Sequence, residues 1–249
     1  MIIRELNHVG LFTHNIDESI RFYRDTLGGI LIRNSASQDW KHRFIYAQIG
    51  AGVVEIIGVA PDARTGFAHV AYLVHPQSLD SAYEFLAGQG FEFTGPPRAA
   101  LSGVGRLVFY KDISGALFEL IQREEDIRKP PFVTDTIASF DGIVINAPAD
   151  KLDNLRAHYT TELGLESRGT LRGDARYGIN DDHLIVRASL SNSDNMEKPD
   201  TMDCIDSIAL TAAPGAMGRL TDAGAPIKDI GDGLFCVSGP SGERLVFSN

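Results

Sequence analysis

Four stretches of the chain share one order of hydrophobic and polar positions. Each opens with a short apolar segment, continues into a stretch with apolar residues at helical spacing, and then reaches a glycine. Positions 8, 69, 141 and 207, which mark the apolar openings, are 61, 72 and 66 residues apart. This regularity predicts an internal repeat with four copies.

The helix in each repeat is predicted from residue spacing. Ile16, Ile20, Tyr23 and Leu27 lie at i, i+4, i+7 and i+11, which places them on one face of a helix over residues 17–27. Gly28 follows directly, and glycine tolerates the left-handed conformation that commonly ends a helix. Comparable stretches predict further helices at residues 79–87, from residue 151 to 163, and near residue 216.

Three strand-like segments follow each of the first two helices. They are residues 30–32, 44–47 and 53–57 in the first repeat, and residues 91–93, 106–110 and 117–121 in the second. Each repeat is therefore predicted to be a βαβββ unit, and the fold class to be α+β. Because a four-stranded sheet with one helix buries its apolar face poorly, such units should pair.

The segment between the second and third repeats breaks the pattern. It carries a run of charged residues followed by Pro130 and Pro131, so we interpret residues 123–138 as a linker. The predicted modules are residues 1–122 and residues 139–249. Residues 189–203 are rich in Ser, Asn and Asp and are predicted to form a surface loop.

Composition narrows the function classes. A length of 249 residues suits two domains, and 23 Lys and Arg against 33 Asp and Glu give a net charge of −10. Such an acidic surface repels phosphate and anionic lipid, so neither nucleic-acid nor membrane binding is expected. The N-terminus lacks the features of a secretory signal. Cys204 and Cys236 are therefore expected to be reduced, in a cytoplasmic protein.

Matching positions of the first two repeats carry candidate metal ligands. The opening strands contain His8 and His69, and the last strands contain Glu55 and Glu119 between aliphatic neighbours. A lone histidine on a strand is usually structural, and a lone glutamate usually faces water. A carboxylate in an apolar strand is costly unless it is paired or metal-bound, and the pattern recurs in two repeats. Together the four residues suit one divalent first-row metal ion.

The second pair of repeats lacks this set. Asp141 and Ser207 replace the two histidines, and Val246 and either Val186 or Arg187 replace the glutamates. The second module is therefore expected to keep the scaffold without the ligands. Its role is left open among a lid, a homodimer surface and a stabilising partner.

Several motifs resemble the vicinal oxygen chelate superfamily, which includes glyoxalase I, extradiol dioxygenases, and bleomycin and fosfomycin resistance proteins. The motifs lie at residues 6–10, 22–28, 68–70 and 109–120, so the resemblance covers roughly residues 6–122. It implies that paired βαβββ units curl into half-barrel modules and that four units form two such glyoxalase-like modules.

The resemblance to glyoxalase-type members implies a metal-dependent lyase or isomerase. His8, Glu55, His69 and Glu119 match their four ligands, for one Fe, Mn, Ni, Co or Zn ion. Such an enzyme moves a proton on a small substrate with two adjacent oxygens, through a metal-stabilised enediolate. Glu119 is the first candidate for the catalytic base and Glu55 the second. No organic cofactor site is predicted.

Two alternatives stay open. An Fe(II) extradiol dioxygenase would use only His8, His69 and Glu119, which leaves Glu55 unexplained. The tyrosine usual in that group ten residues before the metal glutamate is Phe109 here. A metal-free binding or resistance protein would not need the histidines and glutamates at all. The residues therefore favour the lyase or isomerase.

The pocket around the ligands is predicted to be mainly apolar. Residues two apart on a strand share a face, so Gly10 should lie beside His8 and leave space near the metal. The loop at residues 40–43 contains Trp40, His42 and Arg43 and is a candidate to cap the site and bind an anionic tail. The other histidines, namely His14, His75, His158 and His183, are interpreted as surface or core residues.

Overall fold

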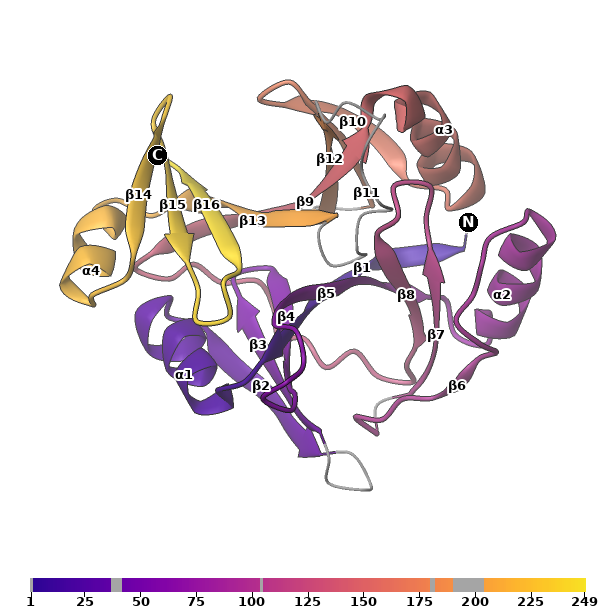
Figure 1. Cartoon of the computed structure of the whole chain (residues 1–249), viewed down its shortest axis with the longest axis horizontal. Helices are drawn as coiled ribbons and strands as arrows, with labels where there is room; N and C mark the ends of the chain where they lie inside the picture. The colour runs from indigo at the N-terminus through magenta and orange to yellow at the C-terminus, as the bar shows by residue number, and fades with distance from the viewer. Residues whose placement is uncertain (1, 37–41, 104, 180–181, 190–203) are drawn as a thin grey trace. The chain divides into compact units, whose positions relative to one another are not determined.

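The computed structural model describes residues 2–36, 42–103, 105–179, 182–189 and 204–249. These residues form two eight-stranded sheets, with few helices (Figure 1). Trp40, Lys41 and nearly all of the predicted surface loop at residues 189–203 lie outside the described residues. None of the described helices is long and apolar enough to cross a membrane.

The first sheet contains the strands of the first two repeats. Their order across the sheet is β2-β3-β4-β1-β5-β8-β7-β6. Strand β1 pairs in parallel with β4, and β5 pairs in parallel with β8. The bounds are β1 (Ile3–Thr13), β2 (Ile30–Ala36), β3 (Arg43–Ile49), β4 (Gly52–Gly58), β5 (Gly66–Val74), β6 (Arg98–Ala99), β7 (Arg106–Lys111) and β8 (Leu117–Gln122).

The second sheet repeats this arrangement with the order β10-β11-β12-β9-β13-β16-β15-β14. The predicted fold class, α+β with four βαβββ units in two glyoxalase-like half-barrel modules, is confirmed. The bounds are β9 (Ile137–Pro148), β10 (Glu166–Leu171), β11 (Asp174–Ile179), β12 (Asp182–Ser189), β13 (Ile205–Ala212), β14 (Ile227–Gly231), β15 (Leu234–Ser238) and β16 (Arg244–Ser248).

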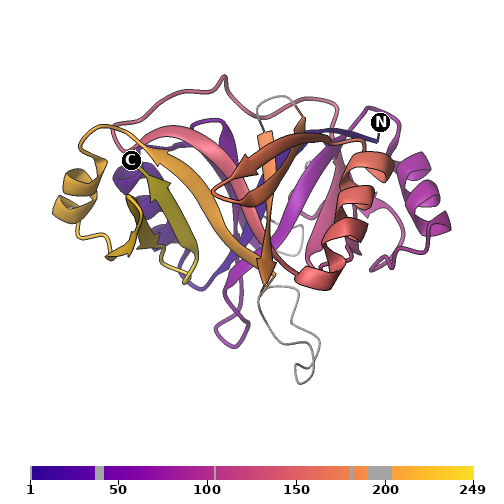
Figure 2. The same cartoon turned by 90° about the horizontal axis from the view of Figure 1, so that it is seen from above.

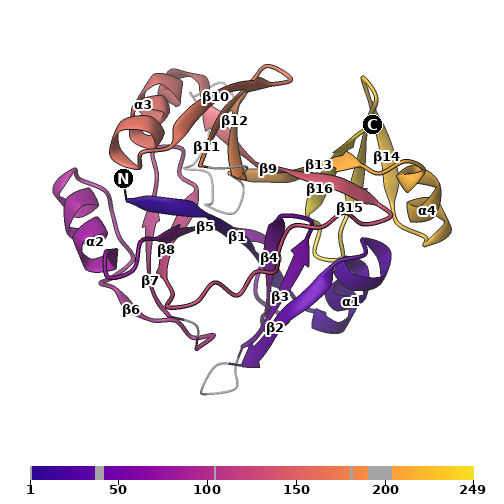
Figure 3. The same cartoon turned by 180° about the vertical axis from the view of Figure 1, so that it is seen from behind.

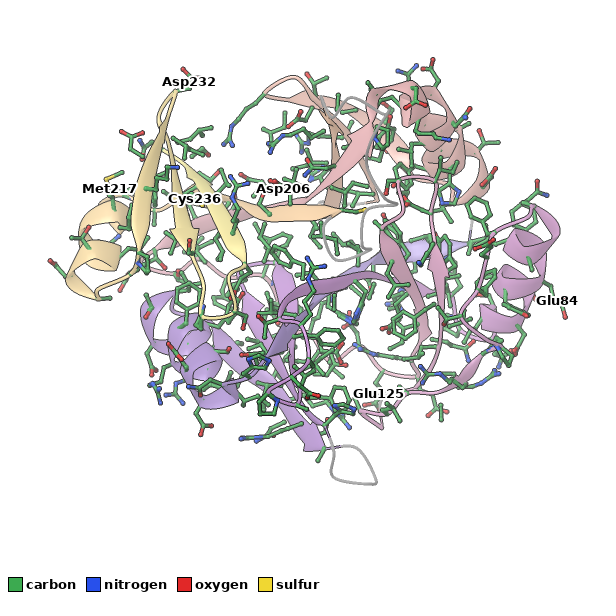
Figure 4. The ribbon with its side chains drawn as sticks, in the orientation of Figure 1. Glu84, Glu125, Asp206, Met217, Asp232 and Cys236 are labelled. Atoms are coloured by element: carbon green, nitrogen blue, oxygen red, sulfur yellow. The ribbon has the colours of Figure 1, made fainter. Side chains whose placement is uncertain are left out.

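Each repeat places a short helix after its first strand. The α-helices are α1 (Ile16–Arg21), α2 (Leu79–Gly88), α3 (Leu152–Ala157) and α4 (Ala216–Asp222). A 3₁₀ turn (Ala149–Lys151) precedes α3. Helix α2 packs beside β7 and β8, α4 (the orange helix in Figure 2) lies beside β14, and β10 packs beside the π-helical turn His158–Glu162 that directly follows α3 (Figure 3). Glu84 points away from α2, as its exposed position requires (Figure 4).

The first and third helices end differently from the prediction. The sequence predicts regular helices through residues 27 and 163, but π-helical turns occupy Phe22–Thr26 and His158–Glu162. The side chain of Asn15 caps the start of α1 by accepting a hydrogen bond from the Glu18 amide. Both π-helical turns hold a fully buried tyrosine, Tyr23 in one and Tyr159 in the other.

The strand predicted at residues 91–93 does not form. Only an isolated bridge joins Phe93 to Tyr110, and the edge strand β6 is two residues long. Pro96 and Pro97 stand between these two contacts. Proline has no amide hydrogen to donate to a strand ladder, which accounts for the interruption.

The described residues divide into two compact units, each of which combines a repeat from the first half of the sequence with a repeat from the second half. One unit contains Ala68–Asp126 and Ile143–Asp206, with Met1–Asn7. The other contains His8–Phe67, Ile127–Gly142 and Ser207–Asn249. In the first unit, the Tyr159 hydroxyl donates to Asp112 at 2.5 Å. In the second unit, the Tyr23 hydroxyl donates to Glu243 at 2.9 Å.

Candidate metal centre

The first pair of predicted ligands lies on the parallel strands β1 and β4. Gly10 is paired with Glu55, and His8 precedes Gly10 by two residues, so the histidine and the glutamate share a face of the sheet. The His8 Nε2 atom lies 3.2 Å from the Glu55 Oε2 atom. Both residues are buried, at 1% and 5% exposure.

The second pair repeats this construction on β5 and β8. Ala71 is paired with Glu119, and His69 precedes Ala71 by two residues. The His69 Nε2 atom lies 3.1 Å from the Glu119 Oε2 atom, and both residues are buried. The first two repeats have therefore placed the same two groups in the same relation.

Apolar side chains surround each pair on its own face. Phe44, Val53 and Ile57 form a buried cluster on the face of Glu55. Leu73, Ala100, Leu107 and Ile121, with Phe109 packed against them, form another on the face of Glu119. Buried carboxylates in such surroundings need a partner, since removal from water costs several kcal/mol per ion.

All four predicted ligands meet the requirement for a shared ion. One ligand atom from each of His8, Glu55, His69 and Glu119 lies within 4.8 Å of the others, and all four residues are buried. Two imidazoles and two carboxylates are donors that suit divalent Fe, Mn, Co, Ni or Zn. The residues present thus fit such an ion, and no other group of this kind occurs among the described residues.

Tyr46 is a neighbour of the site that the sequence reasoning missed. It is paired with Glu55 across β3 and β4, and its hydroxyl donates a hydrogen bond to the Glu55 Oε1 atom. The matching position opposite Glu119, across β7 and β8, is Phe109. Superposition of the two repeats, strand by strand, would have revealed this difference between the two aromatic residues.

Three of the other histidines, His14, His42 and His158, have the following partners outside this set. His14 Nε2 lies 2.7 Å from the Ala63 carbonyl oxygen, and His42 Nδ1 lies 3.2 Å from that of Gly58. His158 is buried, with its Nδ1 atom 2.6 Å from a Glu162 oxygen. Arg43, expected to bind an anionic tail, lies 3.5 Å from Asp17, so its charge is partly offset.

Two further buried acids lie outside the candidate centre and were also missed. Burial raises the pKa of Asp112, although hydrogen bonds from Ser114 and Tyr159 partly counter this. Burial likewise raises the pKa of Glu243. The Glu243 carboxylate fills the space where a Cβ atom on Gly239 would lie, so a larger residue there would require this carboxylate to move. These acids hold tyrosines in place and are not part of the metal set.

The second sheet has apolar residues at the positions that correspond to the glutamates. Val246 is paired with Ala209, which is the register predicted for it. Leu184 is paired with Ile143, two residues after Asp141, so Leu184 takes the position expected for Val186 or Arg187. Arg187 instead pairs with Asp206, at 3.1 Å (Figure 4 labels Asp206 on β13).

Comparison with known families agrees with this arrangement in the first half of the chain. Residues 5–120 match the model of the Glyoxalase/Bleomycin resistance protein/Dioxygenase superfamily. Residues 5–120 are a glyoxalase-superfamily domain. The resemblance inferred from the motifs is confirmed for this domain, and all four predicted ligands lie inside it.

Relatives of the glyoxalase-superfamily domain include enzymes. A lactoylglutathione lyase of Arabidopsis thaliana is 30% identical over 128 residues, which cover 48% of this chain and 44% of that protein. The match thus spans less than half the length of that relative.

Solved structures resemble the whole chain. A Mn(II)-bound glyoxalase of Novosphingobium aromaticivorans has a TM-score of 0.70 at 17% identity, covering 99% of this chain and 82% of that one. The 2,3-dioxygenase LapB of Pseudomonas sp. KL28 has a TM-score of 0.68 at 15% identity, covering 99% and 92%. At such identities the likeness concerns the fold alone.

Proposed function

We propose that this protein is a divalent-metal-dependent enzyme of the glyoxalase type, which moves a proton on a small substrate with two adjacent oxygens. The observation that supports this most is the buried set His8, Glu55, His69 and Glu119, with ligand atoms within 4.8 Å of one another. A fold shared with dioxygenases does not choose between the two chemistries, because function depends on the site.

In this proposal the four side chains hold one metal ion. The neutral His8 and His69 rings each supply a nitrogen, and Glu55 and Glu119 supply carboxylate oxygens. When bound, the ion would act as a Lewis acid that stabilises negative charge on the substrate oxygens. No redox change is needed, so the metal can be any of Fe, Mn, Ni, Co or Zn.

The protein itself then supplies a base and an enclosed surface. Glu119 is the first candidate to take the proton from the substrate carbon and return it to the neighbouring carbon, with Glu55 second. The apolar residues on the face of Glu119, such as Leu73 and Ile121, would contact the substrate body and exclude water.

An Fe(II) extradiol dioxygenase is the second candidate, because a dioxygenase structure matches along the whole chain. Glu55 counts against this candidate. The dioxygenase hypothesis requires only His8, His69 and Glu119 as ligands, yet Glu55 is also buried and its Oε2 atom lies 3.2 Å from His8 Nε2. The phenyl ring of Phe109 offers no hydroxyl where that chemistry would use a tyrosine. A metal-free binding protein is less well supported, because it has no use for four buried ligands.

Metal analysis is the first test. The protein is stripped with a chelator and titrated with Mn²⁺, Co²⁺, Ni²⁺, Zn²⁺ and, without oxygen, Fe²⁺. We expect one ion per chain in the wild type, little in His69→Ala, and full binding in His75→Ala, whose histidine is exposed. Equal metal content in both variants would contradict the proposed ligands.

The reaction type is tested separately with the metal-loaded protein. We expect solvent deuterium to enter the α-carbon of lactoylglutathione or another α-hydroxy carbonyl compound, without oxygen consumption. Lactoylglutathione is a suitable probe because its hydroxyl and carbonyl groups are on adjacent carbons. Oxygen uptake with catechols and no deuterium exchange would favour the dioxygenase instead.

A further inference from the structure

The arginine expected to bind an anionic tail lies on the other face of the first sheet. Arg43 directly precedes Phe44, which belongs to the apolar cluster on the face of Glu55. Successive residues of a strand point to opposite faces, so Arg43 points away from the candidate metal centre. On that side it contacts Asp17 in the first turn of α1. A cation that serves the centre must therefore come from elsewhere.

A different arginine, Arg33 on β2, lies on the face of the candidate ligands. It is paired with Tyr46 on β3, and Tyr46 is paired in turn with Glu55 on β4. Residues directly opposite each other on neighbouring strands share a face, and the Tyr46 hydroxyl donates to Glu55 on this one. A β-bulge shifts the register between Leu31 and Arg33. Bulges commonly redirect side chains beside active sites.

Two polar side chains of β2 have unmet donors on this face. Arg33 is partly buried, and its Nε atom is buried without a hydrogen-bond partner. No carboxylate among the described residues pairs with the Arg33 guanidinium. Ser35 is opposite Phe44, and its hydroxyl oxygen is also buried without a partner. Buried polar groups are normally hydrogen-bonded, so two unmet donors two residues apart indicate a ligand with acceptor oxygens.

We propose that Arg33 and Ser35 bind an anionic group of the substrate, a carboxylate or a phosphate, and thereby select substrates that carry one. This inference rests on the proposed function and names the substrate class. A planar guanidinium can donate two parallel hydrogen bonds to either anion, and the serine hydroxyl can donate one more. The chain has a net charge of −10, which repels anions, so an anionic substrate requires a cation at its site.

The sheet geometry sets the distance between the anionic group and the metal ligands. Neighbouring strands are about 4.8 Å apart, so the backbone of β2 lies about 10 Å from that of β4, which carries Glu55. Strand β3 lies between them and presents Phe44 and Tyr46 on this face. Ile32 packs against the same apolar cluster. The matching substrate has two adjacent oxygens at one end, an apolar body, and an anionic group several bonds away.

A purely structural role for Arg33 must be separated from this one. A partly buried arginine can serve only to cover apolar surface with its stem. Arg43→Gln is the matched control, because it removes a cation from the neighbouring strand β3, on the opposite face. Ser35→Ala removes one proposed donor without changing the charge, so the proposal stays testable if Arg33→Gln does not fold. Thermal unfolding of each variant shows whether it is folded.

The first measurement is the binding of chelating probes to the Co²⁺-loaded protein without oxygen, followed by the visible absorption of Co²⁺. The probes are 4-methylcatechol, 3,4-dihydroxyphenylacetate and 3,4-dihydroxybenzylphosphonate, which share two adjacent oxygens. We expect the wild type to bind one anionic probe about 10-fold or more tightly than the neutral one, the effect of one charge-assisted hydrogen bond. The better anion distinguishes a carboxylate from a phosphate site.

The variants decide which residues cause this preference. Arg33→Gln should remove most of it and Ser35→Ala part of it, whereas Arg43→Gln should keep it. Affinity for 4-methylcatechol should be the same in all four proteins, because this probe has no anionic group to bind. A full preference in Arg33→Gln, or an equal loss in Arg43→Gln, would overturn the inference.

The second measurement is the kinetics of deuterium exchange with two thioesters. Lactoylglutathione carries carboxylates, whereas S-lactoyl-N-acetylcysteamine is neutral. We expect Arg33→Gln to raise KM for lactoylglutathione by about 10-fold with little change in kcat, and to leave both constants for the neutral thioester unchanged. An equal loss with both substrates would show that Arg33 has only a structural role.

Failure of the inference can be told from failure of the proposed function. If the wild type binds no Co²⁺, or if none of the three probes changes the Co²⁺ spectrum, the proposed function is wrong, and the role of Arg33 with it. If the neutral probe binds as tightly as both anionic probes, the metal centre stands and only the anion site is lost.

Discussion

The hydrogen bond from Tyr159 to Asp112 permits a quantitative prediction about stability. Asp112 accepts from the Ser114 amide at 2.9 Å, the Ser114 hydroxyl at 2.5 Å, the Ala116 amide at 3.1 Å and the Tyr159 hydroxyl at 2.5 Å. Tyr159→Phe removes one of these four donors and leaves the ring in place. Tyr159 is fully buried, so water cannot replace the lost hydroxyl without rearrangement.

The size of the effect follows from the charge on the acceptor. A hydrogen bond between neutral groups contributes about 1 kcal/mol to stability, and one to a charged group about 1.5–3 kcal/mol. We therefore expect Tyr159→Phe to lower the free energy of unfolding by about 1–3 kcal/mol. For a chain of this size, each kcal/mol lowers the melting temperature by about 2–4 °C.

Urea unfolding of four proteins measures this directly: wild type, Tyr159→Phe, Asp112→Asn and the double variant. A coupling energy of about 1 kcal/mol or more is expected, since the two side chains are in direct contact. Tyr72→Phe is the control, because the Tyr72 hydroxyl has no acceptor among the described residues and its removal should cost little. The reasoning fails if Tyr159→Phe is no more destabilising than Tyr72→Phe.

Three further predictions concern other parts of the fold. Tyr23→Phe should also destabilise by about 1–3 kcal/mol, because Tyr23 donates to Glu243 as Tyr159 does to Asp112; a wild-type urea midpoint would contradict this. Burial raises the pKa of Asp112 and Glu243, so the stability that each acid contributes is fully present below its unfolded-state pKa near 4. This stability is lost as the pH rises through the higher folded-state pKa. Between pH 4 and 8, the free energy of unfolding should thus fall less steeply in Asp112→Asn/Glu243→Gln than in wild type, by at most about 1.4 kcal/mol per pH unit for each acid. Parallel curves of this free energy against pH would refute the prediction. Gly105→Ala should destabilise by more than about 1 kcal/mol in the same assay, because φ is +84° and the new Cβ would lie 2.0 Å from the Gln122 carbonyl oxygen, whereas Gly103→Ala, with φ of +72° and open space, should lose only the backbone term.

The fold and the four candidate ligands could be predicted because the sequence repeats itself. His8 and His69, with Glu55 and Glu119, occupy equivalent places in two copies of one strand pattern, and comparison within the chain distinguishes them from isolated residues. Each pair depends only on the parallel pairing of two strands. The side-chain period of two then places both groups on one face.

Other features depend on contacts that no local pattern encodes. Glu243 accepts a hydrogen bond from Tyr23, which lies 220 residues earlier in the sequence. The position of Glu243 within its turn also differs from the position of Asp112 within its own turn. The π-helical turns at residues 22–26 and 158–162 carry the same hydrophobic spacing as an ordinary helix, so periodicity could not separate the two. The hydrogen bond from Tyr46 to Glu55 likewise depends on the pairing of β3 with β4, which periodicity alone does not give.

The regrouping of repeats within the compact units has a consequence for biosynthesis. One unit joins residues 8–67 to residues 207–249. This unit therefore cannot fold completely until the ribosome has synthesised residues 207–249. Until then the Tyr23 hydroxyl lacks its hydrogen-bond acceptor, Glu243, and the first repeat exposes apolar surface. Domains usually fold as they are made, from the N-terminus onward. Folding of this unit must instead follow synthesis of residues 207–249, which makes nascent chains candidates for chaperone binding.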